Sequence, residues 1–261
     1  MNEETLLLNN LSIGYKTRKN TKVVVENLSA RISEGKLTCL IGSNGSGKST
    51  LLRTLAGFQP PLSGNIKIYG KDIQTYSDRD LSKLIGVVLT EKVETGNMSV
   101  RELAATGRNP YTGFWGKLSN RDEAIIEEAI ERVNIRFLAD RQIYTLSDGE
   151  RQKAMIAKVL TQQTPIIFLD EPTAFLDFRS KIEIMQLLYD LCRKMNKTIF
   201  LSSHDLDLSL QIADILWILD KERKPVTGSP EKLINDGIID RYFQSKGVVF
   251  DKTKKSFKIK I

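Results

Sequence analysis

The sequence has few of the residues that build disulfide frameworks or membrane spans. Its 261 residues include two cysteines and one histidine. Cys39 and Cys192 lie far apart in apolar surroundings, which indicates core residues in a reducing compartment and neither a disulfide nor a metal pair. No apolar stretch approaches the roughly 20 residues that a membrane-spanning helix needs. We therefore expect any membrane role to depend on a partner.

The amino terminus also lacks a targeting pattern. Met1 is followed by Asn2 and two glutamates, without a basic region and a long apolar run, so no signal peptide is expected. The chain shows no internal repeat. Hydrophobic residues make up 41% and charged residues 27% of the sequence, which is ordinary for a globular protein. This length can accommodate one large α/β domain with an inserted or appended subdomain.

The net charge is positive without identifying a partner. A formal charge of +7 is compatible with a nucleotide, a nucleic acid or an anionic membrane surface. Much of the excess lies in residues 246–261, which contain five lysines besides Lys246. We interpret this segment as a solvated basic C-terminal tail.

The most informative stretch has the spacing G-x-x-x-x-G-K-[ST] of a phosphate-binding P-loop. It consists of Gly42, Ser43, Asn44, Gly45, Ser46, Gly47, Lys48, Ser49 and Thr50. The glycines let the backbone wind closely around an anion, and the loop N–H groups with the following helix N-terminus point at the phosphate. Lys48 brings an ammonium to the phosphate oxygens, Ser49 offers a hydroxyl to Mg²⁺, and Thr50 can bond a neighbouring phosphate.

The elements predicted along the chain alternate in the way of an α/β protein. Before and soon after the P-loop, short strands suggest an antiparallel β layer beside the nucleotide. Later strands alternate with helices, which indicates right-handed βαβ units in a parallel sheet. The predicted strands are 6–15, 23–32, 37–41, 66–69, 85–89, 166–169, 198–202 and 215–219, and the predicted helices are 49–56, 182–195 and 206–213.

Residues of about 91–160 have a different pattern, which we interpret as a helical insertion. Ser99 opens a short helix over 100–106. Ser119 and Asp122 have the spacing of a capping box, which predicts a helix that runs to Val133. A further helix is predicted from Gly149 to residue 160.

Two carboxylates follow the buried strand 166–169. An aspartate at the carboxyl end of a strand, next to the P-loop strand, is the Walker B pattern and would hold Mg²⁺ through water, which assigns that role to Asp170. Glu171 can then polarise the attacking water. The alternative for this pair is an ordinary strand end that meets solvent.

Residues 146–152, LSDGERQ, come about twenty residues before Asp170. Here the chain resembles the ATP-binding-cassette (ABC) ATPases, whose signature is LSGGQ. The resemblance covers nearly the whole chain in order: P-loop, helical insertion, signature, Walker B, the D-loop Leu176-Asp177 and the switch segment 202–205. It implies a P-loop NTPase with a RecA-like core, an antiparallel β subdomain and an inserted helical subdomain, in a single ABC ATPase domain over residues 1–245.

The resemblance also implies roles for single residues. Lys48 and Glu171 would act in hydrolysis, with His204 as γ-phosphate sensor. Asp177 would couple two sites, and Tyr15 would stack on adenine. A structural histidine and a packed strand tyrosine are the alternatives for His204 and Tyr15.

Ser147 and Gly149 form a second expected anion site, because they start a helix. A second site on a different subdomain makes sense if two chains meet head-to-tail. Each ATP would then be clamped between the P-loop of one chain and the signature of the other, as the family does. A homodimer is therefore implied.

Two positions depart from the family pattern. Asp148 stands where glycine is usual, and we expect this acid near the γ-phosphate to slow or retune closure. At the Q-loop, Thr90 and Glu91 stand where glutamine is usual. Either could offer oxygen to Mg²⁺ or to the water, and we take Thr90 as the candidate metal ligand.

Softer stretches resemble the ATPase subunits of importers for iron-siderophore, haem and vitamin B12. They are residues 100–103, 107–110, 138–141, 204–208 and 228–230. This resemblance implies ATP and Mg²⁺ as ligands, integral-membrane permease partners, indirectly a substrate-binding protein, and a place at the cytoplasmic face of the membrane, without nucleic acid.

The aromatic residues Tyr111, Phe114 and Trp115 would suit a contact with the permease, or equally the core of the helical subdomain. Two other functions stay open. One is an ABC ATPase without transport, in Fe–S assembly or linked to nucleic acid. The other is a binding module without catalysis, against which Glu171 and His204 argue.

Overall fold

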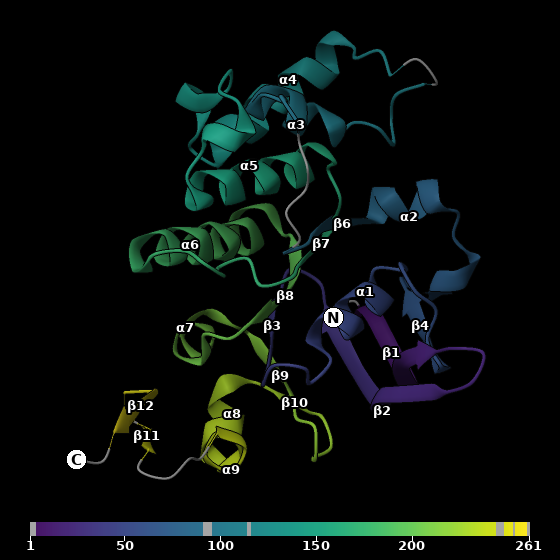
Figure 1. Cartoon of the computed structure of the whole chain (residues 1–261), viewed down its shortest axis with the longest axis vertical. Helices are drawn as coiled ribbons and strands as arrows, with labels where there is room; N and C mark the ends of the chain where they lie inside the picture. Colours follow the sequence, from purple (N-terminus) through teal and green to yellow (C-terminus); the bar gives the residue numbers. More distant parts are fainter. Residues whose placement is uncertain (1–3, 91–95, 114–115, 244–247, 253, 260–261) are drawn as a thin grey trace.

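The computed structural model describes residues 4–90, 96–113, 116–243, 248–252 and 254–259 (Figure 1). In these ranges a six-stranded central sheet with helices is joined by a four-stranded sheet, which contains the N-terminal strands, and by a C-terminal hairpin. No helix in these ranges is both long and apolar enough to cross a bilayer.

The central sheet has the strand order β10-β9-β3-β8-β7-β6. Its strands are β3 (Leu37–Gly42), β6 (Ile85–Val88), β7 (Ile166–Leu169), β8 (Thr198–Ser203), β9 (Ile215–Leu219) and β10 (Val226–Gly228). β10 pairs antiparallel to β9, and the other pairings are parallel. The predicted parallel sheet is confirmed. The prediction that the Asp170 strand lies next to the P-loop strand is wrong, because β8 pairs with both β3 and β7 and separates them.

The central sheet divides two hydrophobic cores, since successive side chains of a strand point to opposite faces. Cys39 and Ile41 enter one core, whereas Leu40 enters the other. The second core contains a row of aromatic rings in edge-to-face contact, with centroids 5.6 Å apart for Phe168 and Phe200 and 5.1 Å apart for Phe200 and Trp217. Strands buried on both faces read as continuous apolar runs, which is why the sequence predicted them well.

Helices cover both faces of this sheet (Figure 1). One core holds residues of α5, α6, α7, α8 and α9, and the other holds α1 with the N-terminal strands. The bounds are α1 (Lys48–Leu55), α2 (Asp78–Leu84), α5 (Asp148–Thr161), α6 (Phe178–Met195), α7 (Leu206–Ile212), α8 (Pro230–Asn235) and α9 (Ile238–Phe243). Cys192 lies on α6 and is a buried free thiol like Cys39. Burial raises the pKa of both thiols to about 12, which keeps them protonated and inert.

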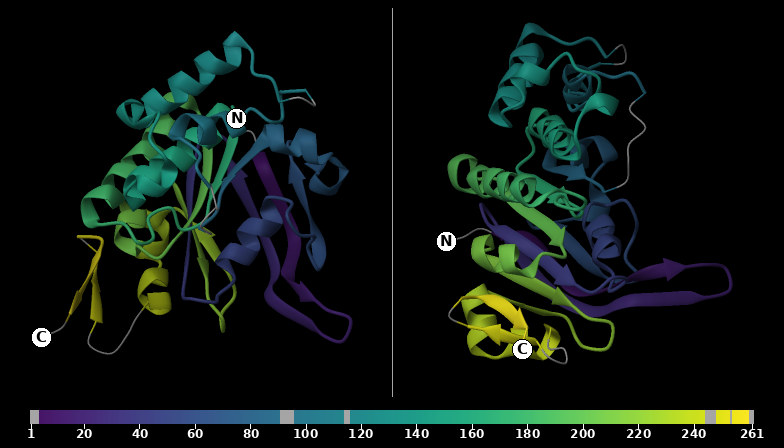
Figure 2. Two further views of the ribbon diagram at one scale, coloured as in Figure 1. Left: turned by 45° about the horizontal axis from the view of Figure 1, so that its top comes forward. Right: turned by 60° about the vertical axis from the view of Figure 1, so that its left-hand side comes forward.

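The predicted antiparallel layer is also present. β1 (Glu4–Lys16), β2 (Thr21–Ser33), β4 (Ser63–Ile68) and β5 (Lys71–Asp72) form a sheet of order β2-β1-β4-β5. The β1–β2 hairpin extends away from the rest of the chain (Figure 2, right). This layer packs against α1, so the helix that follows the P-loop is held between two sheets.

The helical insertion places α3 (Val100–Thr106) and α4 (Asn120–Arg132) beside α5 (Figure 1). Capping boxes at Ser99, Ser119 and Ser147 start these three helices, as the spacing predicted for Ser119. Short 3₁₀ turns link the elements at η1 (Ile73–Thr75), η2 (Arg136–Leu138) and η3 (Ile143–Thr145).

The predicted solvated tail is wrong for the described part of residues 246–261. This part forms a hairpin of β11 (Val248–Asp251) and β12 (Ser256–Ile259). Phe250 is only 6% exposed and belongs to the same core as α6 and α7, and Phe257 packs against that core. The many lysines suggested a solvated segment, although two apolar residues, Phe250 and Phe257, pack on the core. The boundary after residue 245 stays a prediction.

Candidate functional site

The P-loop connects β3 to α1 in a conformation that only glycine tolerates. Gly47 has a φ of 102°, and a Cβ at this position would lie 2.3 Å from a side-chain carbon of Val24. A Cβ on Gly42 would lie 2.4 Å from the Leu219 carbonyl oxygen. Gly47 is also the N-cap of α1 and offers no side-chain hydrogen bond to the first turn. The first N–H groups of α1 are thereby available to an anion.

Lys48 is buried at the start of α1, with only 5% of its surface exposed. Its Nζ donates to the carbonyl oxygens of Gly42, at 2.9 Å, and Ser43, at 3.4 Å. The nearest carboxylate is that of Glu171, with Oε1 at 3.8 Å. Burial lowers the pKa of the Lys48 ammonium, while the carboxylates of Glu171 and Asp170 oppose this shift. A phosphate would therefore give this buried cation a closer anionic partner.

Asp170 directly follows β7 and accepts hydrogen bonds from two hydroxyl groups. Its Oδ1 accepts hydrogen bonds from Ser202 Oγ at 2.6 Å and from Ser49 Oγ at 3.2 Å. The P-loop and the Walker B strand thus meet at Ser49 and Asp170, although β8 lies between their strands. Ser202, on β8, belongs to the switch segment 202–205, but the sequence analysis gave it no role of its own. The signal for it was a serine at the carboxyl end of a buried strand.

Thr90 lies beside the same strand end. Its hydroxyl donates to the backbone carbonyl oxygen of Asp170 at 2.7 Å. Because the hydroxyl uses its hydrogen in this contact, the lone pairs of the Thr90 oxygen stay available beside Asp170, and a metal ligand needs such lone pairs. Its role as a metal ligand stays a prediction. Glu91, the other Q-loop candidate, lies outside the described residues.

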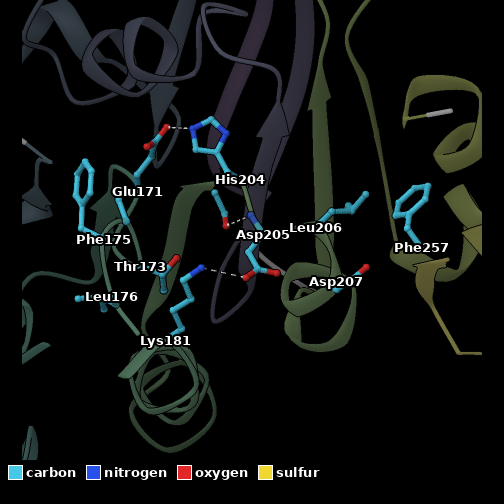
Figure 3. A pocket seen from close by; sticks show the side chains of 12 residues that line it. Glu171, Thr173, Phe175, Leu176, Lys181, His204, Asp205, Leu206, Asp207 and Phe257 are labelled. Atoms are coloured by element: carbon cyan, nitrogen blue, oxygen red, sulfur yellow. Dashed lines mark hydrogen bonds and ion pairs between the residues drawn. The ribbon is translucent and has the colours of Figure 1, made fainter. Parts of the chain in front are cut away.

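Glu171 and His204 form a close pair (Figure 3), and Lys48 of the P-loop lies 3.8 Å from Glu171. Glu171 Oε1 lies 2.5 Å from His204 Nε2. The backbone of Glu171 has a φ of 48°, an uncommon value for this residue type, and its N–H donates to Ser202 Oγ at 2.8 Å. Strained backbone at a carboxylate beside a buried lysine is typical of a functional site.

Tyr15 lies near the end of β1 and contacts the first turn of α1, the helix that follows the P-loop. Its hydroxyl lies 2.7 Å from Thr50 Oγ1, and 49% of the residue is exposed. An exposed ring beside the phosphate loop is what an adenine-stacking residue needs. Stacking itself stays a prediction.

The signature residues lie at the exposed start of α5. Ser147 is the N-cap, and its Oγ donates to Glu150 Oε2 at 2.8 Å and accepts from the Glu150 N–H at 3.3 Å. Asp148 pairs with Arg151, with Oδ1 and Nη1 3.1 Å apart. Ser147 is exposed and Gly149 half-exposed, so neither is packed inside the protein.

The start of α5 adjoins the start of α6. A Cβ on Gly149 would lie 2.9 Å from Ser180 Oγ, and Ser180 hydrogen-bonds to Asp177 through both its N–H, at 2.8 Å, and its hydroxyl, at 3.1 Å. These bonds hold the pKa of the Asp177 carboxyl below its usual value. The structure thus brings Asp177 beside the signature, an adjacency that sequence spacing could not show.

A cavity of about 550 Å³ opens beside Glu171 and His204 (Figure 3). Leu176 of the D-loop and the preceding Phe175 contribute to its wall, and the C-terminal hairpin contributes Phe257. The lining by Phe257 was not predicted.

Tyr111 contacts a neighbouring arginine and the residue that follows α5. Its hydroxyl donates to the Gln162 carbonyl oxygen at 2.9 Å, and its ring lies 4.0 Å from the Arg108 guanidinium carbon. Because 38% of Tyr111 is exposed, these contacts do not make it a core residue, and both alternatives for it stay predictions. Phe114 and Trp115 lie outside the described residues.

Comparison with known proteins identifies the family. The family described as ABC transporter matches residues 25–174, which is more than half of the chain. The chain belongs to the ABC transporter family. An uncharacterized ABC transporter ATP-binding protein of Methanocaldococcus jannaschii is 39% identical over 251 residues, which cover 96% of this chain and 85% of that protein.

Two further relatives agree with this assignment. The ferric enterobactin transport ATP-binding protein FepC of Escherichia coli is 35% identical over 241 residues, covering 92% of this chain and 88% of that protein. Among solved structures, CbiO1 of Clostridium perfringens, part of an ABC transporter complex, is similar with 28% identity and a TM-score of 0.78, over 92% of this chain and 94% of that one. The predicted family, cassette fold and ATPase class are confirmed, so this chain is an ABC ATPase that binds ATP.

Proposed function

We propose that this chain is the ATP-hydrolysing subunit of an importer that takes up an iron chelate, haem or cobalamin through a membrane permease. One observation carries the hydrolytic part of the proposal. The P-loop, the adjacent Asp170 and Glu171, and His204 meet within hydrogen-bonding or ion-pair distances, although they come from three separate stretches of the sequence. The transport ATP-binding protein of Escherichia coli described above supports an iron chelate as cargo.

The residues suit an in-line attack of water on the γ-phosphate. Phosphoryl transfer needs positioning and charge neutralisation more than covalent chemistry. Lys48 and the α1 N–H groups neutralise charge that develops on the phosphates. Glu171 orients the attacking water and polarises it as a general base. His204, 2.5 Å from Glu171, senses the γ-phosphate.

The donors near Asp170 fit Mg²⁺ as the cofactor. Ser49 Oγ and Asp170 Oδ1 are hard oxygen donors 3.2 Å apart, and Mg²⁺ prefers a few such donors together with phosphate oxygens. When bound, Mg²⁺ supplies positive charge to the phosphates. Ser49 and Asp170 would hold it, with Thr90 as a third candidate.

A homodimer would complete the ATP site. The exposed start of α5, with Ser147 and Gly149, lies on a different part of the chain from the P-loop. Two copies arranged head-to-tail would place each signature against the ATP of the partner, with Asp177 between the two sites. ATP binding would close the dimer, and hydrolysis would open it.

The permease would receive this movement at the cytoplasmic face of the membrane. It supplies the membrane spans that the described helices of this chain do not form. A substrate-binding protein would deliver cargo from the other side without touching this chain, and no nucleic acid is needed.

Co-purification tests the transport proposal. The affinity-tagged full chain, isolated from detergent-solubilised membranes, should bring down a polytopic permease. Recovery of soluble partners alone would favour an ABC ATPase without transport. In proteoliposomes with that permease, ATP hydrolysis should rise with an iron chelate, haem or cobalamin, and stimulation by none of these would reject the cargo class.

A further inference from the structure

We infer that Lys181 is a positioning residue, which ties the D-loop of a chain to the switch histidine of the same chain through an ion pair with Asp205. The inference deepens the proposed function, because it names the side chain that carries the coupling assigned to Asp177. It rests on the roles proposed for Asp177 and His204 in hydrolysis. Neither Lys181 nor Asp205 takes part in the steps described above.

The backbone of Lys181 is attached to the D-loop. Lys181 lies one turn into α6, and its N–H donates to the Asp177 carbonyl oxygen at 3.0 Å. Asp177 is the N-cap of that helix and accepts from the Ser180 N–H at 2.8 Å. The first turn of α6 contains no acidic residue, and a cation near a helix start is unfavourable for the helix itself. A lysine at this position therefore needs a partner outside α6.

That partner is the residue that follows the switch histidine. Nζ of Lys181 lies 3.7 Å from Oδ2 of Asp205 (Figure 3). The exposed fractions of the two side chains are 32% and 27%, so the pair is partly shielded from water. Both residues line the cavity beside Glu171 and His204. The ion pair thus connects the start of α6 with the segment between β8 and α7.

Asp205 is well placed to pass this connection on to His204. Its Oδ1 accepts from the Leu208 N–H at 3.2 Å and so caps α7. Its own N–H donates to Ser203 Oγ at 3.0 Å, which fixes the backbone on both sides of His204. One carboxylate oxygen of Asp205 thus holds α7, while the other faces Lys181. A displacement of Lys181 therefore acts on the backbone that carries the His204 ring.

The connection runs from Asp177 through Lys181 and Asp205 to His204, which lies 2.5 Å from Glu171. In the proposed dimer, Asp177 lies between the two ATP sites. ATP bound at one site would shift the D-loop, and the start of α6 would move with it. The ion pair then brings His204 to the position that hydrolysis requires. Because the pair is partly exposed, we expect its loss to reduce turnover without abolishing it.

Steady-state ATP hydrolysis by the full-length protein tests the inference. Lys181→Met keeps a long side chain without charge and should lower kcat about threefold, the range of one partly exposed ion pair. KM for ATP should change less than about twofold, because the P-loop is unchanged. Lys181→Arg keeps the charge and should retain nearly wild-type kcat. Wild-type kcat in Lys181→Met, or an equal loss in Lys181→Arg, would overturn the inference.

A matched control lies on the same helix. Lys194, at the other end of α6, pairs with Asp190, with Nζ and Oδ2 2.9 Å apart. Lys194→Met removes the same charge from an ion pair that joins only residues of α6, so it should keep wild-type kcat. A loss equal to that of Lys181→Met would show that charge on α6, and not the tie to Asp205, sets the rate. Thermal unfolding of each variant confirms that folded protein is compared.

The partner residue gives a second, independent route. Asp205→Asn removes the charge but keeps a side-chain oxygen that can cap α7. It should lower kcat as much as Lys181→Met, and the double variant should lose no more than either single variant, because both changes break one pair. Losses that multiply in the double variant would contradict the ion pair.

A cycle with Asp177 separates coupling from a purely structural role. In an Asp177→Ala background the D-loop end of the connection is already lost, so Lys181→Met should lower kcat by less than about 1.5-fold. The same fold-loss in both backgrounds would overturn the inference. Wild-type turnover in both Glu171→Gln and His204→Ala would instead refute the proposed hydrolytic function, whereas wild-type turnover in Lys181→Met alone refutes only the tie between the D-loop and His204.

Discussion

We expect the starts of two helices, α1 and α5, to face the phosphates of ATP. The first N–H groups of α1 have no capping side chain, whereas those of α5 have one. α1 begins after Gly47, without any side chain to cap its first N–H groups. α5 begins at Ser147, whose capping box with Glu150 already satisfies two N–H groups. An uncapped helix start binds an anion by itself, whereas a capped one gains less from doing so. We call the P-loop with α1 the P-loop half of the ATP site, and the start of α5 with Ser147 the signature half. The P-loop half should therefore bind ATP alone, and the signature half should act only once a second chain brings its nucleotide.

The charged groups of the P-loop half and the signature half of the ATP site also differ, because those of the P-loop half are more deeply buried. Lys48 is buried and surrounded by the carbonyl oxygens of the loop and the Glu171 carboxylate. Asp148 and Arg151 are an exposed pair, with side-chain exposures of 57% and 31%. Buried charges respond strongly to a change of partner, and exposed pairs contribute little. Substitutions in the P-loop half should have larger effects than those in the signature half.

The largest effect is expected for Glu171→Gln. Loss of the carboxylate should lower turnover about a thousandfold, while ATP binding is retained because the P-loop is unchanged. With ATP, the variant should accumulate as a dimer in size-exclusion chromatography. A variant that stays monomeric at high ATP, or that hydrolyses ATP normally, would contradict the proposed role. Adding Ser147→Ala should weaken the trapped dimer, because it acts only on the signature half.

The structure also shows how far the sequence could be interpreted without coordinates. The P-loop, the Asp170-Glu171 pair and His204 each follow a strand that the sequence predicted and the structure shows, because those strands are buried and mostly apolar. The position of β8 between β3 and β7 could not be predicted, because the order of strands in a sheet does not follow from their order in the sequence. The contact of Ser202 with Asp170 was not predicted for that reason.

Two other features were hidden by polar residues. α6 starts at Phe178, four residues before the predicted start at Ile182, because its first turn is exposed and lacks apolar periodicity. Asp177 caps that turn, and this places it beside the signature. The hairpin at 248–259 was read as a tail because lysines outnumber its buried aromatic residues, yet Phe250 and Phe257 suffice to dock it.

A second prediction concerns the helical region that carries the signature. Asp122 on α4 pairs with buried Arg108, with Oδ1 and Nε 2.7 Å apart, and Arg108 also donates to the Thr161 carbonyl oxygen at 2.7 Å. Asp122→Asn should lower the free energy of unfolding by about 3 kcal/mol, because it leaves a buried guanidinium unpaired. Urea unfolding at pH 7 measures this loss, and Asp140→Asn, which removes an exposed partner of Arg101, serves as the control.

The loss should depend on pH. Hydrogen bonds from the Ser119 side chain and backbone, with Arg108, lower the pKa of Asp122 from 3.8 to about 2. A lowered carboxyl pKa stabilises the folded state fully above the unfolded value and progressively less as the pH falls toward the folded value. The difference between wild type and Asp122→Asn should therefore shrink between pH 4 and about pH 2. A difference that is constant over this range would exclude the charge as its cause.

A third prediction separates the ring of Tyr15 from its hydroxyl. Tyr15→Ala should raise KM for ATP about tenfold, the effect of losing one aromatic stack on a base, with kcat little changed. Tyr15→Phe keeps the ring and loses only the bond to Thr50, 2.7 Å away, and should bind ATP nearly as well as wild type. Equal KM values for the Ala and Phe variants would show that the hydroxyl, not stacking, matters.

The smallest effect is expected at Asp148, where the chain departs from its family. In a closed dimer this carboxylate would face the phosphates of the partner's ATP, and Arg151, 3.1 Å away, offsets its charge. Asp148→Asn should therefore raise turnover about threefold, within the range of an exposed charge pair, and the gain should fall as salt increases. Arg151→Ala should lower turnover in the wild type and have little effect beside Asp148→Asn. Asp140→Asn, the same change on an exposed acid away from the start of α5, should leave turnover unchanged; if it raises turnover equally, the effect reflects net charge and not closure at the signature.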